Sequence, residues 1–391
     1  MHFECADVVV IGGGVVGMTT ALALGDAGRT VWLLEAGQMG QEASWAGGGI
    51  MMPLYAWRGP RQLDALLMRS LAELVQLVDR LKTCAGIDPE WNACGLWVRG
   101  LTPQECQEAQ DWATLCGWPV ALKSYKTWAG TCGLTLGEPI DTLTLSEDLW
   151  FPSVANIRNP RLLKGLEALL KQHPRITVSA FSPVRRVDRE GDALSVVLES
   201  FAIRANDAVC AAGAWSTRLL NKSLLPGTPI ISPTLGQMML LQYEHDDALP
   251  MVLQNDRYII PRKGGLVLVG STVEYCGYQK KWDADAYSAL LEFAVSLLGE
   301  SVRHTVQAQW AGLRPDAGRD VPVIGPHPQV PGLWFNTGHF RNGLVLAAGS
   351  ANYLTQCMRE GWEAATQAEN AFGVSLADRS SRLAASREVM L

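Results

Sequence analysis

The chain has no basic tract longer than two residues, and its formal net charge is −6. Proteins that bind nucleic acid through its phosphates need clustered lysines and arginines on one face. The basic runs here are pairs such as Arg185-Arg186 and Lys280-Lys281. The composition therefore argues against a nucleic-acid partner.

The chain also lacks paired cysteines. Its nine cysteines are an odd number, no two are closer than ten positions, and no CxxC motif occurs. This spacing signals neither a zinc site nor a redox pair, so no metal is expected. Scattered single cysteines are typical of small core residues in a reducing compartment, which predicts a cytoplasmic protein.

No membrane span is expected. The one candidate, residues 8–25, carries no charge, but glycines interrupt it between residues 12 and 17. Acidic residues flank it, Glu4 and Asp7 before and Asp26 after, where a signal peptide carries positive charge. We therefore interpret this segment as part of a folded domain.

What the chain does have is length and apolar character. Its 391 residues exceed the ~250–300 at which a single hydrophobic core stops growing, so two domains are expected. Hydrophobic residues make up 48% and charged residues 18%, a balance typical of globular proteins.

A glycine-rich turn lies near the N-terminus. Hydrophobic periodicity predicts a strand, a helix and a second strand between residues 8 and 34. Before the helix, Gly12, Gly14 and Gly17 have the GxGxxG spacing. Gly12 allows the tight turn, Gly14 lets the backbone approach a pyrophosphate, and Gly17 allows close packing of helix on strand.

Glu35 ends the second strand, eighteen residues after Gly17. A carboxylate at this place can accept hydrogen bonds from the hydroxyls of an adenosine ribose. Strand, turn, helix, strand and acid in register predict a Rossmann-like dinucleotide site, for either a nicotinamide or a flavin cofactor.

The next segment favours flavin. It reads AGQMGQEASWAGGGIMMPLY and contains Ser44 and three consecutive glycines, at positions 47 to 49. Clustered glycines indicate backbone that runs close to something flat or bulky. Trp45 and Ile50 make the segment too apolar for a solvated loop.

The rest of the pattern predicts helices and strands in separate regions. A helix is predicted over 60–83, and a tryptophan-rich insertion over 88–150 begins a second domain. Asn159 is predicted as the N-cap of a helix. Strands dominate residues 228–312, with one amphipathic helix near 284–299.

Six motifs together resemble the D-amino acid oxidase family of flavoproteins, and within it the bacterial glycine oxidases of the thiamin pathway. In chain order they are VVVIGGGVVG, EASWAGGGI, AAGAWS, YIIPRKGGLVLVGST, WAGLRPD and NTGHFRNGLVLA. The likeness extends to about residue 360, and GLRP and GHFRNG are its most specific elements.

The resemblance implies an α/β fold. A Rossmann-like FAD-binding domain would be built from discontinuous segments, beside an α+β substrate domain with a largely antiparallel sheet. The predicted FAD domain comprises residues 1–87, 150–220 and 312–375, the substrate domain 88–149 and 221–311, and a tail 376–391.

The resemblance also implies where FAD is held. Backbone N–H groups of the GHFRNG turn would face the flavin from the N-terminus of a helix that follows directly. The residues implied to contact FAD are Gly12, Gly14, Val15, Val16, Gly17, Glu35, Ala36, Ala43, Ser44, Gly48, Gly49, Ile50, Val184, Gly213, His339, Phe340, Arg341, Asn342, Gly343 and Leu344. The stretch PDAGRDVPVIGPH has no cysteine that could bond the flavin, so FAD is expected to be non-covalent.

Three residues are implied to handle the substrate. Arg314 in GLRP would pair with its carboxylate through a bidentate fork, Arg341 is a second arginine nearby, and Tyr258 is a pocket tyrosine. His339 fits either packing or catalysis. Leu235 departs from the basic residue that glycine oxidases commonly carry before GQ, which bears on substrate preference.

The implied reaction is the oxidative deamination of a small amino acid, with molecular oxygen as acceptor. Hydride transfer from Cα to flavin N5 would give an imine, then a 2-oxo acid, ammonia and hydrogen peroxide. Glycine, sarcosine, other N-substituted glycines and small D-amino acids all fit. The alternatives are a dehydrogenase that passes electrons to a quinone or carrier, a tRNA-modifying flavoenzyme, which the lack of a basic face disfavours, and a non-catalytic flavin subunit. The oligomeric state is open, including a homo-oligomer.

Overall fold

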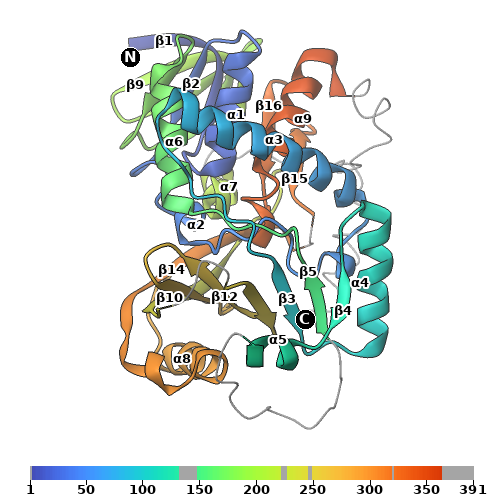
Figure 1. Cartoon of the computed structure of the whole chain (residues 1–391). Coiled ribbons are helices and arrows are strands. Elements are labelled where there is room, and N and C mark those ends of the chain that lie inside the picture. Colours follow the sequence, from blue (N-terminus) through green and yellow to red (C-terminus); the bar gives the residue numbers. More distant parts are fainter. Residues whose placement is uncertain (1, 132–147, 222–226, 245–248, 319–320, 363–391) are drawn as a thin grey trace, which may run out of the picture.

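The computed structural model describes residues 2–131, 148–221, 227–244, 249–318 and 321–362. Within them the chain forms two eight-stranded sheets, one above the other in Figure 1. The fold is the predicted α/β type. No helix in the described ranges is both long enough and apolar enough to cross a membrane.

The first sheet has the strand order β15-β16-β9-β1-β2-β6, with β7 and β8 attached through β9. Its strands are β1 (His2–Ile11), β2 (Val31–Leu34), β6 (Ile176–Ser179), β7 (Arg186–Glu190), β8 (Ala193–Val197), β9 (Phe201–Cys210), β15 (Val323–Pro326) and β16 (Leu333–Thr337). The central strands run parallel, and the continuous apolar run at residues 8–10 is fully buried, as expected for a strand covered on both faces.

Parts of the chain that are distant in sequence meet in this sheet. β1 pairs with β2 on one side and with β9 on the other, and β16 pairs with β9. The start, the middle and the C-terminal third of the chain therefore build one sheet. This agrees with the discontinuous domain that was predicted.

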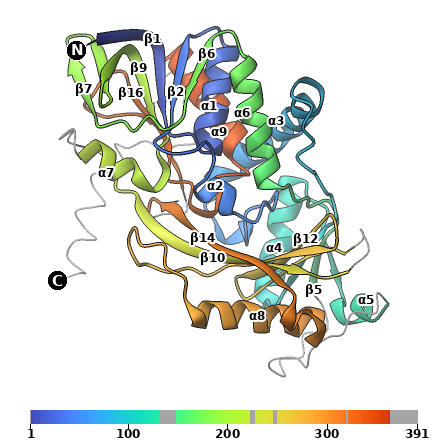
Figure 2. The same ribbon diagram turned by 90° about the vertical axis from the view of Figure 1, so that its left-hand side faces the viewer.

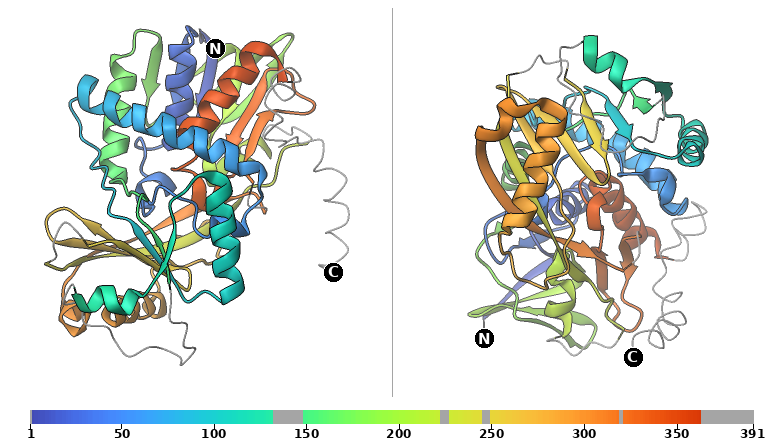
Figure 3. Two further views of the ribbon diagram at one scale, coloured as in Figure 1. Left: turned by 45° about the vertical axis from the view of Figure 1, so that its right-hand side comes forward. Right: turned by 90° about the horizontal axis from the view of Figure 1, so that it is seen from below.

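Four helices cover the same side of the first sheet, with α3 lying across the others (Figure 3). They are α1 (Val15–Asp26), α3 (Gln62–Cys84), α6 (Asn159–Gln172) and α9 (Ala347–Glu360). Thr19 Oγ1 donates to the Ala347 carbonyl over 3.1 Å, which fastens the start of α9 to α1. Helix α1 follows the glycine turn at residues 12–17, and α9 is the first helix after the GHFRNG turn at residues 338–343 that is longer than one turn. These two helices are thus neighbours.

The predicted N-cap of α6 is wrong. Arg158 is the N-cap, and Asn159 is the first helical residue. The Asn159 Oδ1 has no partner among the described residues, and its Nδ2 donates to the carbonyls of Ser44 and Gly47, more than a hundred positions earlier.

The second sheet has the order β14-β10-β13-β12-β11-β3-β5-β4 and is mostly antiparallel. Its strands are β3 (Leu96–Arg99), β4 (Ala121–Lys123), β5 (Asp148–Phe151), β10 (Ser232–Gln242), β11 (Met251–Gln254), β12 (Arg257–Arg262), β13 (Leu266–Gly270) and β14 (Val306–Asp316). The tryptophan-rich insertion supplies β3, β4 and β5, so it does join the second sheet.

Helices α4 (Pro103–Cys116), α5 (Tyr125–Thr131) and α8 (Ala284–Leu298) belong to this lower half, and α8 covers the face turned away from the first sheet (Figure 2). The short helices α2 (Ala43–Ala46) and α7 (Ser216–Asn221) lie between the sheets. The predicted domain boundaries at 150 and 312 fall within β5 and β14 and stay predictions. The predicted tail lies outside the described residues.

Candidate active site

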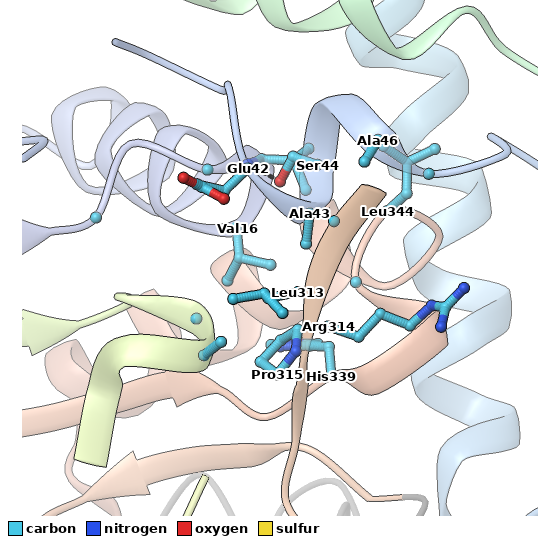
Figure 4. Close-up of a pocket in the computed structure, with 18 of the residues that line it drawn as sticks. Val16, Glu42, Ala43, Ser44, Ala46, Leu313, Arg314, Pro315, His339 and Leu344 are labelled. Atoms are coloured by element: carbon cyan, nitrogen blue, oxygen red, sulfur yellow. Dashed lines mark hydrogen bonds between the residues drawn. The ribbon is translucent and has the colours of Figure 1, made fainter. Parts of the chain in front are cut away.

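The two sheets enclose a cavity of about 630 Å³. It lies at the carboxyl ends of β1, β2 and β9, where open α/β sheets bind their ligands, and β10, β12 and β14 supply the opposite wall. In Figure 4, Val16 and Leu313 face each other across part of it. All the predicted FAD contacts line the cavity except Gly17 and Asn342.

The first glycine turn shapes one end of the cavity. Gly12 has φ +118°, and a side chain there would run into the backbone of Ala211. Gly14 precedes α1, lines the cavity and leaves the helix without a side-chain cap. Gly17 faces inward, where a Cβ would overlap the Gly12 carbonyl, so its role is packing. A helix N-terminus that follows a glycine turn can bind an anion through its backbone N–H groups.

Glu35 stands at the same end, directly after β2. Its two carboxylate oxygens accept from the N–H groups of Gly13 at 2.7 Å and Gly37 at 2.8 Å. The N–H of Ser182 donates to the Glu35 carbonyl at 2.7 Å, which brings the segment that contains Val184 to the cavity. A carboxylate held in this way keeps free lone pairs for ligand hydroxyls.

The second glycine loop, residues 43–50, runs along the cavity and is held from behind. The Asn159 amide donates to two of its carbonyls at 2.8 and 3.0 Å, and Trp310 Nε1 donates to the Ala46 carbonyl at 3.0 Å. Ser44 Oγ accepts from the N–H of Val15 at 2.9 Å. The loop is therefore tied to α6, β14 and the start of α1.

Arg262 adds a further tie to this loop. Its Nη2 donates to the Gly48 carbonyl at 2.6 Å, and its Nη1 donates to Asn156 Oδ1. Burial of the guanidinium end lowers its pKa to about 10. The sequence did not predict that Arg262, Asn159 and Trp310 support this loop. For Arg262, the one available signal was a charged residue at the end of the apolar strand RYIIPR.

The C-terminal glycine turn, GHFRNG at residues 338–343, differs from its prediction. We call it the second glycine turn. After Gly338, with φ +76°, the chain enters a 3₁₀ turn, η4 (Phe340–Asn342), and α9 begins only at Ala347. The helix therefore does not follow the turn directly. Phe340 has φ +49°, a left-handed conformation that an α-helix cannot contain, so the helix must begin later.

Asn342 faces away from the main cavity. It lines a smaller adjoining cavity of about 190 Å³, and Phe340 and Arg341 line both cavities. The contact from Asn342 to FAD stays a prediction.

His339 is buried in the wall of the main cavity. Its Nε2 has no hydrogen-bond partner among the described residues. Burial lowers the pKa of the imidazole to about 3, so the ring is neutral at physiological pH. A neutral ring whose Nε2 is unpaired fits packing better than proton transfer.

Arg314 lies on β14, in the wall of the cavity that the second sheet supplies. Its Nη1 donates to the Thr272 carbonyl at 3.0 Å and its Nη2 donates to Ser271 Oγ at 2.8 Å. The guanidinium lies over Gly236, where any side chain would collide with it. Burial lowers the pKa of Arg314, and the nearby Arg341 charge acts in the same direction. An arginine nevertheless keeps its charge in proteins.

Arg341 and Tyr258 line the cavity together with Arg314. Arg341 pairs with Asp256 at 3.1 Å, and the Tyr258 hydroxyl, which is buried, lies 3.4 Å from Met238 Sδ. The structure thus brings the three predicted substrate residues, from β14, η4 and β12, to one cavity. Arg218 is a third arginine in the lining, and Glu35 and Glu42 are its two carboxylates. A guanidinium such as that of Arg314 or Arg341 matches the carboxylate of a small molecule.

A parallel sheet with a glycine turn at its carboxyl edge, closed over by a second sheet, has the architecture of a dinucleotide-dependent enzyme. The chain belongs to the FAD dependent oxidoreductase family, whose model matches residues 7–357. The predicted family and FAD as cofactor are thereby confirmed. The start of α1 after Gly14, Glu35 and the two glycine turns fit this cofactor along the cavity.

Relatives of known activity support this placement. A glycine oxidase of Pseudomonas aeruginosa is 40% identical over 353 residues, which cover 90% of this chain and 94% of that protein. A bifunctional protein ThiO/ThiG of Nostoc sp. is 26% identical, over 90% of this chain and 53% of that protein. The crystal structure of glycine oxidase from Geobacillus kaustophilus has a TM-score of 0.81 at 23% identity, over 91% of this chain and 95% of that one, which shows the shared fold.

Proposed function

We propose that this FAD-dependent amino acid oxidase deaminates glycine or a similarly small amino acid. The observation that carries the proposal is the Arg314 guanidinium, held in the wall of a cavity that both glycine turns also line. A guanidinium matches a carboxylate with two parallel hydrogen bonds, so it selects amino acids over simple amines. The likeness to glycine oxidases supports a small side chain.

FAD supplies the acceptor for the Cα hydride of the neutral amine. The chain's own part is positioning: Arg314 and Arg341 bind the carboxylate, and Tyr258 borders the substrate. His339 is neutral and buried, which fits a reaction that needs no side-chain base. Water then hydrolyses the imine to a 2-oxo acid and ammonia, and molecular oxygen takes the electrons to give hydrogen peroxide.

We further propose a place in thiamin thiazole synthesis and a cytoplasmic location. The first is supported by the likeness to the bifunctional protein ThiO/ThiG. The second is supported by the cysteines, since none of the eight in the described residues forms a disulfide.

The test is a peroxidase-coupled assay of the purified protein in air. The panel contains glycine, sarcosine, N-ethylglycine and D-alanine, each matched by an amine without a carboxylate, such as methylamine or ethylamine. We expect peroxide from the amino acids and little from the amines. Reduction of an artificial dye without peroxide would instead identify the dehydrogenase alternative, and no turnover in either assay would rule out both.

The mode of FAD attachment is tested separately. We propose non-covalent binding, because residues 315–327 contain no cysteine. Precipitation with trichloroacetic acid should release all yellow colour into the supernatant. Colour that stays in the pellet would show a covalent bond.

A further inference from the structure

Behind Arg314, outside the cavity, three side chains form a hydrogen-bonded group. Glu274 Oε1 accepts from Thr272 Oγ1 at 2.5 Å and from Gln237 Nε2 at 2.9 Å. Thr272 Oγ1 in turn accepts from the backbone N–H of Gln237 at 3.0 Å. We call Gln237, Thr272 and Glu274 the rear triad. None of the three lines the cavity.

The rear triad fastens the groups that hold Arg314. Thr272 belongs to it, and its carbonyl is the acceptor for Arg314 Nη1. Ser271, whose Oγ accepts from Nη2, is the preceding residue. The Leu235 carbonyl accepts from Nη1 at 3.4 Å, and Leu235 and Glu274 also exchange two backbone hydrogen bonds, at 2.9 and 3.0 Å. Glu274 is therefore hydrogen-bonded directly to Thr272 and to Leu235, which supply two of the acceptors. The third acceptor, Ser271, is the neighbour of Thr272 in the chain.

The geometry gives Glu274 an indirect role. Glu274 forms no ion pair with Arg314, although its negative charge favours the charged guanidinium. Gln237 is 1% exposed, and such a buried amide must have partners. Its Nε2 bonds Glu274, and its Oε1 accepts from the N–H of Asp283 at 3.3 Å. Loss of the carboxylate would leave this amide and the Thr272 hydroxyl without their acceptor.

We propose that Glu274 is a positioning residue for substrate recognition: through Thr272 it holds the residue 271–272 segment that aims Arg314 at the substrate carboxylate. This inference rests on the proposed function, in which Arg314 binds that carboxylate. A guanidinium that is free to rotate would lose the two-pronged alignment before it lost its charge. The expected defect is therefore in the binding and orientation of carboxylates and not in FAD binding.

The test is a double-mutant cycle with a conservative rescue. The variants are Glu274→Ala, Glu274→Gln, Thr272→Val and the double variant Thr272→Val with Glu274→Ala. We expect kcat/KM for the best amino acid to fall about tenfold in Glu274→Ala and somewhat less in Thr272→Val. Glu274→Gln should recover most of the loss, because its amide oxygen can accept the same two bonds. The double variant should be no worse than Glu274→Ala, because both changes break one connection.

Two further measurements separate positioning from general damage. The first is the titration of the flavin absorbance with glycolate, a carboxylate without an amine, which should bind about tenfold more weakly to Glu274→Ala. The second is the FAD dissociation constant, which should not change. Thr305→Val is the matched control, because it removes a hydroxyl bonded to the Val302 carbonyl at 3.0 Å, just before β14 begins and nine positions from Arg314.

The outcomes are distinct. Additive losses in the cycle, failure of the Gln rescue, or normal glycolate binding by Glu274→Ala would overturn the inference. If Arg314→Met lost carboxylate binding while Glu274→Ala kept it, the proposed function would stand without the rear triad. If glycolate bound equally well to wild type and Arg314→Met, the proposed function itself would fail. If Glu274→Ala does not fold, Thr272→Val and Glu274→Gln still test the inference: Thr272→Val should weaken glycolate binding, and Glu274→Gln should keep most of it.

Discussion

Arg341 Nη1 lies 3.1 Å from Asp256 Oδ1, so the second arginine of the cavity is already paired with a carboxylate of the chain. Asp256 belongs to the turn between β11 and β12, and its N–H donates to the Tyr55 hydroxyl at 3.1 Å. The Asp256 side chain is 57% exposed and that of Arg341 is 23% exposed. Because exposed pairs contribute only ~0–1 kcal/mol, a substrate carboxylate can compete with Asp256 for Arg341.

The first prediction follows from this competition. Asp256→Asn should release Arg341 toward the substrate and lower KM for the amino acid by up to about fivefold, with little change in kcat. Steady-state kinetics at low and high salt measure the effect, which salt should reduce. Glu105→Gln is the control, since it breaks the nearby Arg58–Glu105 pair without touching Arg341. A raised KM in Asp256→Asn would show that Asp256 orients Arg341 and does not compete for it.

The second prediction concerns Arg314. Arg314→Met removes charge-assisted hydrogen bonds worth about 1.5–3 kcal/mol, so kcat/KM should fall at least tenfold to a hundredfold. Carboxylate inhibitors should weaken in parallel, while amines without a carboxylate lose little. The flavin spectrum should stay the same, because the guanidinium bonds Ser271 and Thr272 and no predicted FAD contact. Near-normal efficiency, or collapse of FAD binding, would contradict the assignment.

The local parts of this site could be predicted from the sequence. Gly12, Gly14 and Glu35 fall within one unit of strand, turn, helix and strand, where spacing alone determines their relative positions. Arg314 was predicted through its motif. The resemblance to the family also implied an FAD domain built from discontinuous segments, and so a chain that returns to its first sheet.

The supporting contacts could not be predicted, because they join distant parts of the chain. Asn159 lies 115 residues from Ser44, and its polar side chain before a proline was interpreted as a local cap. Arg262 bonds a carbonyl 214 residues away. The second turn was extended directly into a helix because nothing in GHFRNG shows that Phe340 has a positive φ. A non-glycine residue takes that conformation through tertiary packing, which local sequence does not reveal.

The third prediction contrasts two glycines of the first turn. Gly14→Val should abolish FAD retention while the apoprotein stays folded, because the site lines the cavity and the nearest atom to an added Cβ is Ser44 Oγ at 3.1 Å. Gly17→Val should fail to fold, because its Cβ would overlap the Gly12 carbonyl. The ratio of flavin to protein absorbance and the circular dichroism melting curve separate the two effects.

Gly130→Ala is the control for this contrast, because no atom lies within 4 Å of an added Cβ there. It should keep both FAD and stability. Stoichiometric FAD with an unchanged spectrum in Gly14→Val would show that the first turn is not the pyrophosphate site.

The fourth prediction concerns pH and stability. Burial lowers the pKa of His339 from an ordinary 6.5 to about 3, so the unfolded chain binds this proton more readily than the folded one. Between those two pH values the unfolded state carries one more proton, and the free energy of unfolding therefore falls as the pH falls. At pH 5.5 this one residue should cost ~1.4 kcal/mol relative to pH 7.5 or above.

His339→Gln removes this titration and leaves a side chain of similar size. The fall in Tm between pH 7.5 and pH 5.5 should therefore be smaller in the variant than in the wild type, while His304→Gln, at an exposed position, should behave like the wild type. His327, whose pKa burial also lowers, is present in every variant, so its effect cancels in the comparison. The pH profile of kcat between pH 6 and 9 should keep its shape in His339→Gln, because a neutral ring has no proton to lose there. An equal fall in Tm in His339→Gln and wild type would show that the imidazole is accessible to protons in the folded protein. A shifted pH profile of kcat in His339→Gln would show that His339 takes part in catalysis.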